Sequence, residues 1–127
     1  MIRIAESEWI IMKELWKETP LTSRQIIDNI GDRTDWNDKT IHTLISRLCK
    51  KGAIKSEKKK GSPFYSYHAN ISEEECVKEE TKNFIQRMYA GSLKNLVSTF
   101  APDESVTKND IQELRNLLDE LEKGKRK

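Results

Sequence analysis

Apolar residues in the first half of the chain recur at helical spacing in three segments. Residues 6–17 place tryptophan and methionine side chains at i, i+3 and i+7, which predicts an amphipathic helix with Ser7 available as its N-cap. Residues 22–31 begin with a capping-box pattern and end in glycine, so a short second helix is expected there. A third helix is predicted over residues 37–52, from an asparagine cap to a glycine stop.

The predicted third helix has one apolar face and one polar face. At a rotation of about 100° per residue, a single sector of roughly 100° contains Ile41, Leu44, Ile45 and Leu48. The opposite side carries the basic and hydrogen-bonding residues Lys39, Thr43, Ser46 and Lys50, flanked by His42 and Arg47. By itself this pattern fits either a solvated surface or a face that binds an anion.

Two short strands are predicted after the third helix, over residues 53–59 and 64–69, because the second is rich in aromatic residues and a Lys-Gly-Ser-Pro turn separates them. Three helices followed by a hairpin with a basic tip is the order of a winged helix-turn-helix, whose third helix enters the major groove of DNA. The hairpin, or wing, is then expected to place Lys58, Lys59 and Lys60 beside phosphates.

The remainder of the chain is predicted to be helical over residues 72–91, 92–100 and 107–124. Its apolar stripes have no obvious partner within the segment, so a second copy of the chain or the first 70 residues must cover them. We expect the second copy, across a twofold axis. The residues predicted to form this dimer surface are Phe84, Met88, Leu93, Leu96, Val97, Ile111, Leu114, Leu118 and Leu121.

The expected fold is therefore mainly α with a small β-hairpin: a winged helix-turn-helix domain over residues 1–70 and a C-terminal helical dimerisation domain over residues 71–127. The composition fits this division. Of the 127 residues, 35% are hydrophobic and 35% charged, and mean hydropathy is -0.78, so a lone protomer buries a modest core. Residues 1–70 carry a net charge of +4 and residues 71–127 carry -2, which makes the first domain the anion binder.

The sequence also argues against several function classes. No apolar run approaches the roughly 20 residues of a membrane span, and a cytoplasmic protein is expected. Cys49 and Cys76 are too few for a four-ligand zinc site, and packing is the expected role of Cys76 and His68. No Gly-rich phosphate loop or catalytic motif is present, so no enzyme activity, cofactor or metal is expected.

Several segments together carry a resemblance to a known family. They are Ser7-Glu8-Trp9 with Met12 and Leu15-Trp16, KTIHTLISRLCKKG over 39–52, FIQRMY over 84–89, SLKNLVSTF over 92–100 and IQELRNLLDEL over 111–121. Their order and spacing resemble the BlaI/MecI family of bacterial repressors of β-lactamase and penicillin-binding-protein genes. The resemblance implies a homodimer on palindromic, double-stranded operator DNA. It also implies release from DNA after a membrane-bound β-lactam sensor protease signals.

The resemblance assigns roles to individual residues. The family's recognition-helix motif falls on Lys39, Thr40, Thr43 and Arg47, while His42 stands where the family usually has arginine. Arginine makes two hydrogen bonds to guanine, whereas neutral histidine offers one donor and one acceptor. His42 is therefore expected either to contact a different base from the family's arginine or to contact phosphate or water. The family's cleavage segment LVxNF is LVSTF here, which places Thr99 before Phe100. Residues 39–60 form a cationic cluster, with eight basic side chains (Lys39, Arg47, Lys50, Lys51, Lys55, Lys58, Lys59 and Lys60) against one acid, Glu57. From the motif and this cluster, the predicted DNA-binding set is Lys39, Thr40, His42, Thr43, Arg47, Lys50, Lys58, Lys59 and Lys60.

Two alternatives remain at this point. Copper-responsive repressors resemble the same architecture but carry clustered cysteines near the C-terminus, and no cysteine follows Cys76 here. A winged-helix module that binds protein is distinguished from a DNA reader by a salt titration, because phosphate contacts make affinity fall steeply with salt.

Overall fold

The computed structural model describes residues 2–100 and 102–125 and divides into two compact units, Met1–Thr81 and Lys82–Lys127. The boundary between the units falls inside helix α4 (Glu73–Tyr89). This is later in the chain than residue 70, where the sequence analysis divided the domains.

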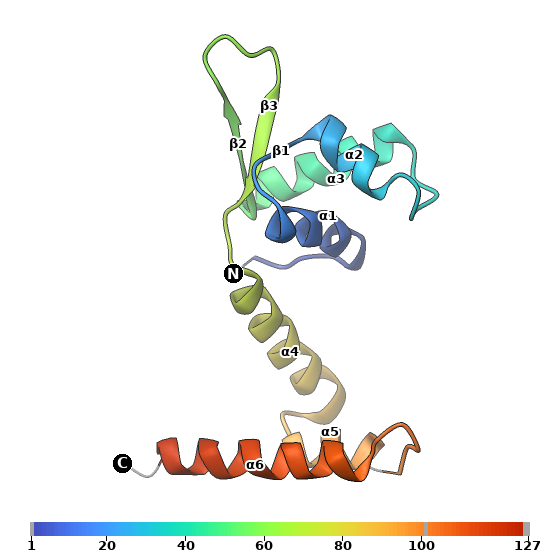
Figure 1. Ribbon diagram of the computed structural model, residues 1–127, viewed down its shortest axis with the longest axis vertical. Coiled ribbons are helices and arrows are strands. Elements are labelled where there is room, and N and C mark those ends of the chain that lie inside the picture. The colour runs from blue at the N-terminus through green and yellow to red at the C-terminus, as the bar shows by residue number, and fades with distance from the viewer. Residues whose placement is uncertain (1, 101, 126–127) are drawn as a thin grey trace. The chain divides into compact units, whose positions relative to one another are not determined.

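The N-terminal unit combines helices with a small antiparallel sheet (Figure 1). Its elements are α1 (Glu6–Lys17), β1 (Leu21–Thr22), α2 (Ser23–Ile30), α3 (Asp38–Lys51), β2 (Ile54–Lys58), β3 (Tyr65–Ala69) and the start of α4. The strand order is β1-β3-β2, with Tyr67 of β3 opposite Leu21 on one side and Ser56 on the other. The mainly helical fold with a winged helix-turn-helix is confirmed. The sheet has three strands rather than the two that were predicted.

The helix ends follow from local chemistry. Thr22 and Gln25 form the predicted capping box, with each side chain bonded to the other residue's backbone N–H, at 2.9 and 3.2 Å. The prediction of Ser7 as the cap of α1 was wrong. The N-cap is Ala5, and the Glu8 side chain accepts a hydrogen bond from the Ala5 backbone N–H at 2.7 Å. Glu8, the third residue of the helix, thus supplies the glutamate half of a capping box by satisfying the N–H of the cap residue, while the alanine side chain contributes no hydrogen bond.

The core of the N-terminal unit lies where α1, α2 and α3 meet the sheet. Residues that are fully or almost fully buried include Ile11, Met12, Leu15, Leu21, Ile26, Ile30, Ile41, Leu48 and Ile54. Three of these belong to α1 and two to α3, so the apolar face of α3 is held against α1. The opposite face of α3 is thereby directed to solvent.

The C-terminal unit contains the end of α4, α5 (Leu93–Phe100) and α6 (Lys108–Lys125). The turn after α4 has positive φ at Ala90 and Gly91, of 50° and 84°. Helix α6 continues through Gly124, where the sequence analysis placed its end. Across residues 82–100 and 102–124 no side chain is buried. None of the described helices is long and apolar enough to cross a membrane.

Candidate nucleic-acid interface

The solvent face of α3 collects most of the residues that the sequence assigned to DNA. Asn37 caps the helix by accepting a hydrogen bond from the Thr40 N–H at 2.9 Å, and Gly52 ends it with a φ of 81°. Because the apolar side is buried, the exposed residues of this helix include Lys39, His42, Thr43, Arg47 and Lys50. Thr40 is half-buried, and its hydroxyl donates to the Asn37 side-chain oxygen at 3.0 Å. Thr40 therefore donates two hydrogen bonds to the N-cap residue and lies at the edge of the exposed face.

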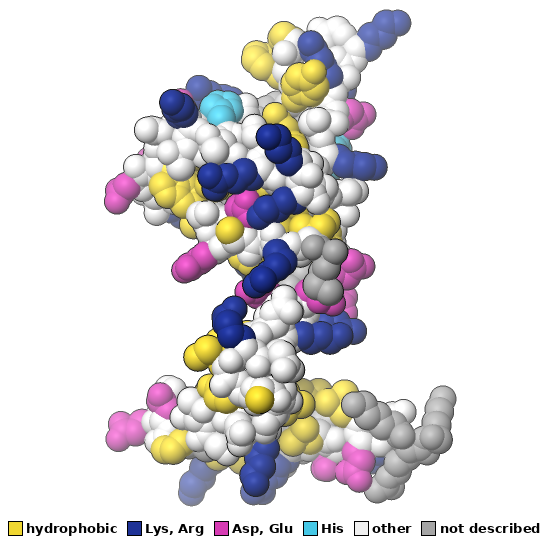
Figure 2. Space-filling model, turned by 180° about the vertical axis from the view of Figure 1, so that it is seen from behind, with side chains coloured by type: hydrophobic (Ala, Val, Ile, Leu, Met, Phe, Trp, Pro, Cys, Tyr) yellow, Lys and Arg dark blue, Asp and Glu magenta, His cyan; other side chains and the backbone are white. Residues whose placement is uncertain are grey.

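The wing supplies a second group of cations. Lys58 ends β2, and Lys59 and Lys60 follow in the loop to β3, all of them exposed. The loop turns through a hydrogen bond from the Ser62 N–H to the Lys59 carbonyl at 3.0 Å, with Gly61 at a φ of 87°. Figure 2 shows one face of the molecule, on which several Lys and Arg side chains gather over the N-terminal unit. The structure thus leaves the predicted lysines of α3 and of the wing available to an anionic partner.

One basic residue between the start of α3 and the wing forms an ion pair within the protein. The ammonium of Lys51, the last residue of α3, pairs with the buried Glu8 carboxylate and donates to the Arg3 carbonyl at 2.9 Å. Sequence alone places Lys51 in the cationic cluster of residues 39–60. The structure assigns it to anchoring α3 on α1 instead.

A further cation, absent from the predicted DNA-binding residues, lies near the start of α3. Arg24 of α2 lies 3.6 Å from the Asp38 carboxylate and 3.8 Å from that of Asp28, and all three side chains are more than half exposed. The i, i+4 spacing of Arg24 and Asp28 is readable from the sequence. The proximity of Arg24 to Asp38, by contrast, depends on how α2 packs against α3.

The thiols and His68 lie in settings that favour packing or pairing. Burial raises the pKa of the Cys76 thiol, which is part of the core, and the nearby Glu75 raises it further. Burial also raises the pKa of the half-buried Cys49 thiol.

His68 was expected to be a packing residue, but it also has a polar partner. Its imidazole lies 2.9 Å from the Glu57 carboxylate of the neighbouring strand, and the two form an ion pair when the imidazole is protonated. Among the described residues no group of three or more His, Cys, Asp or Glu side chains is placed to hold a metal ion.

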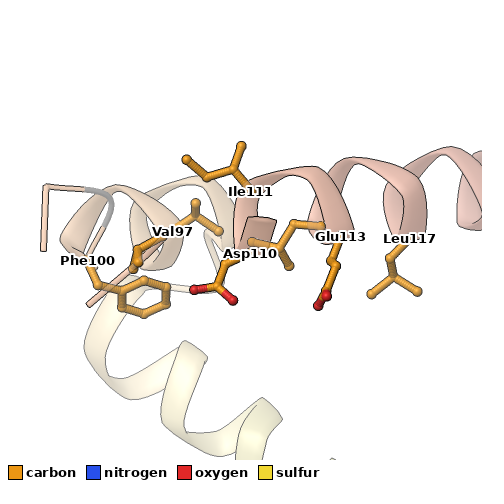
Figure 3. Close-up of a pocket in the computed structure, with 8 residues that line it drawn as sticks. Val97, Phe100, Asp110, Ile111, Glu113 and Leu117 are labelled. Atoms are coloured by element: carbon orange, nitrogen blue, oxygen red, sulfur yellow. The ribbon is translucent and has the colours of Figure 1, made fainter. Parts of the chain in front are cut away.

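The C-terminal unit exposes the apolar residues that were predicted to form a dimer surface. Leu96 is half-buried, and the others are exposed: Phe84, Met88, Leu93, Val97, Ile111, Leu114, Leu118 and Leu121. Between α5 and α6 there is a groove of about 550 Å³, and Figure 3 shows Val97 and Phe100 of α5 with Ile111 and Leu117 of α6 at this groove. The predicted dimer surface omitted three apolar residues that line this groove, Phe100, Val106 and Leu117. Leu117 stands three residues after Leu114, so helical spacing contained the signal.

The candidate cleavage bond lies at the end of α5. Thr99 and Phe100 are exposed and belong to the last turn, where the Thr99 hydroxyl donates to the Asn95 carbonyl at 3.0 Å. A cut at this bond would separate Val97 from the α6 residues that line the same groove.

Comparisons with known proteins agree with this arrangement. The profile of the family described as "Penicillinase repressor" matches residues 4–120. The chain is similar to the methicillin resistance regulatory protein MecI of Mammaliicoccus sciuri, at 36% identity over 91% of this chain and 92% of that protein. It is also similar to the penicillinase repressor of Staphylococcus aureus, at 35% identity over 96% of this chain and 95% of that protein.

A solved structure resembles the N-terminal part. It is the solution structure of the Bacillus licheniformis BlaI monomeric form in complex with the blaP half-operator. The TM-score is 0.50 at 32% identity, over 56% of this chain and 84% of that chain.

Proposed function

This chain belongs to the penicillinase repressor family, and we propose that it is a cytoplasmic, homodimeric transcriptional repressor that binds palindromic operator DNA. Proteins of this family are DNA-binding regulators and not enzymes. The relatives are named for methicillin resistance and penicillinase regulation, which supports control of β-lactam resistance genes as the role of this chain.

The observation that carries the proposal is the solvent face of α3. This helix of 14 residues is about 21 Å long and presents Arg47, His42 and Thr43 on the side away from the core. A helix of this kind fits the major groove, about 12 Å wide, where arginine donates two hydrogen bonds to guanine O6 and N7. Lys59 and Lys60 of the wing supply phosphate contacts, which position the protein without reading sequence.

The exposed apolar residues of the C-terminal unit support the homodimer. Val97, Leu114 and Leu118 lie on helices that bury nothing within the described part of this unit. A second copy of the same surface covers them at a self-complementary interface. Two reading heads then bind two half-sites in one event, and the second contact gains the effective concentration that linkage provides.

The end of α5 supports inactivation by proteolysis. A cut between Thr99 and Phe100 detaches α6, and with it Leu114 and Leu118, from the rest of the chain. DNA affinity is then lost through loss of the dimer, while α3 is unchanged. The partner that we propose for this step is a membrane-bound β-lactam sensor protease.

The test is selection of bound duplexes from a random DNA pool, followed by a salt titration with the best duplex. We expect affinity to fall steeply with salt. Arg47→Ala should weaken binding by about 1–3 kcal/mol and change the sequence preference. Lys17→Ala, an exposed cation of α1, is the matched control and should bind as the unaltered protein does.

Two outcomes would revise the proposal. Equal losses on the selected duplex and on random DNA would make Arg47 a phosphate anchor rather than a base reader. No DNA binding at low salt would contradict the repressor function and favour a protein-binding winged helix.

A further inference from the structure

The wing carries an exposed aromatic residue that neither the fold nor the lysine contacts explain. Phe64 is 65% exposed, and it lies outside the cluster of residues that form the core or pack against it. Tyr67, three residues later, packs against that cluster. A phenylalanine in water at the tip of a hairpin gains nothing from burial within its own chain.

The loop holds the Phe64 backbone in place although its side chain makes no core contact. The Ser62 hydroxyl oxygen accepts a hydrogen bond from the Phe64 N–H at 3.2 Å and donates to the Phe64 carbonyl at 3.4 Å. Pro63 between them has a restricted φ. The ring is therefore presented from a constrained backbone, so less conformational entropy is lost when a partner binds it.

The surroundings of Phe64 indicate an anionic partner. Lys58, Lys59 and Lys60 precede it in the same hairpin, with Glu57 as the nearest acid before them. The Lys58 ammonium lies 5.6 Å from the ring centroid of Tyr65, the residue that follows Phe64, so a wing lysine and an exposed aromatic ring already lie together in this hairpin. An apolar protein partner does not require three lysines, whereas duplex DNA offers both phosphates and an apolar groove wall of sugars.

We propose that Phe64 is a DNA-contacting residue whose ring enters the minor groove while the wing lysines bind the flanking phosphates. The minor groove is about 6 Å wide, and phenylalanine is one of the apolar side chains that proteins insert there between base steps. This inference rests on the proposed DNA-binding function and adds an apolar, salt-independent contact to it.

The test uses the full chain and a duplex selected from a random pool with the unaltered protein. Phe64→Ala should weaken binding about tenfold and leave the slope of affinity against salt unchanged, because no ionic contact is removed. Phe64→Leu, which keeps an apolar side chain, should lose about threefold or less. Lys59→Ala with Lys60→Ala is the matched comparison and should flatten the slope by up to about two units.

The folding control is the denaturation midpoint followed by tryptophan fluorescence, which Phe64→Ala should leave unchanged because the side chain is outside the core. The fluorescence intensity of a 2-aminopurine base placed beside the half-site should change when the unaltered protein binds. This change in intensity should be lost with Phe64→Ala.

Affinity of Phe64→Ala within twofold of the unaltered protein would overturn the inference, and so would a loss that disappears at high salt. If the unaltered protein binds the selected duplex and Arg47→Ala weakens that binding as predicted, unchanged binding by Phe64→Ala overturns this inference alone. If the unaltered protein binds no duplex at low salt, the proposed function itself fails.

Discussion

The ion pair between Glu8 and Lys51 gives the sharpest prediction about the stability of the reading head. The Glu8 side chain is 1% exposed, and one of its oxygens accepts hydrogen bonds from the Ala5 N–H and the Lys51 ammonium. Its other oxygen is buried with no hydrogen-bond partner among the described residues. Removal of the ammonium therefore leaves a buried carboxylate with a single neutral donor.

Lys51→Met keeps most of the apolar side chain and removes the ammonium, with its charge and its hydrogen bonds to Glu8 and the Arg3 carbonyl. Breaking a fully buried pair by removing one partner costs about 3–5 kcal/mol. Lys51 is 35% exposed, so water partly compensates, and we expect a loss of about 2–3 kcal/mol in the free energy of unfolding. Glu8→Gln in the same chain removes the stranded charge and should restore part of that loss.

The assay is urea denaturation at fixed protein concentration, followed by tryptophan fluorescence. All three tryptophans, Trp9, Trp16 and Trp36, lie in the N-terminal unit, so the signal reports this unit alone. Lys50→Met, the exposed neighbour on α3, is the control and should change the free energy of unfolding by less than about 0.5 kcal/mol. Equal effects of Lys50→Met and Lys51→Met would refute the assignment of Lys51 to an internal pair.

Three further predictions concern DNA reading, assembly and inactivation. His42→Arg should change the base preferred by the protein at one operator position, measured by repeating the selection, because arginine adds a bidentate contact to guanine; an unchanged consensus would place His42 on phosphate or water. Leu118→Asp, at a position 62% exposed in the single chain, should shift sedimentation toward monomer at micromolar concentration, and a persistent dimer would move the interface elsewhere. A chain that ends at Thr99 should sediment as a monomer and bind the selected duplex far more weakly; full dimerisation and binding would contradict the proposed switch.

Periodicity predicts most of the N-terminal unit because α1, α2 and α3 each bury one apolar face. The spacing of Ile41, Leu44 and Leu48 is sufficient to orient α3 and to identify its exposed side. Strand β1, by contrast, has two residues, too few for any alternation to appear. It exists because Leu21 pairs with Tyr67, a contact between distant parts of the chain. Sequence patterns do not contain such pairings.

The candidate site shows the same limit for charged residues. Lys50 and Lys51 are neighbours in the sequence, equally basic and both in contact with solvent, yet Lys51 also pairs with the buried Glu8 carboxylate. The difference arises from the rotation of about 100° between successive helical residues and from the position of α1 beside α3. Composition identifies a cationic segment, and only tertiary packing separates its internal cations from those left for DNA.

The exposed C-terminal unit links assembly to stability in the proposed repressor. Because Val97, Leu114 and Leu118 remain exposed in a single chain, the second copy supplies the burial that stabilises α5 and α6. The free energy of this unit then depends on protein concentration, as it does for any dimer whose partner binds only the folded form. The candidate cleavage bond lies in the last turn of α5, and a protease requires that turn to unwind. A dimer interface formed by these helices, as proposed, would protect this bond, and we expect cleavage to proceed through protomers whose α5 and α6 are uncovered. The rate of inactivation should accordingly fall as the dimer fraction rises, which joins the oligomeric state to both the affinity for DNA and its loss.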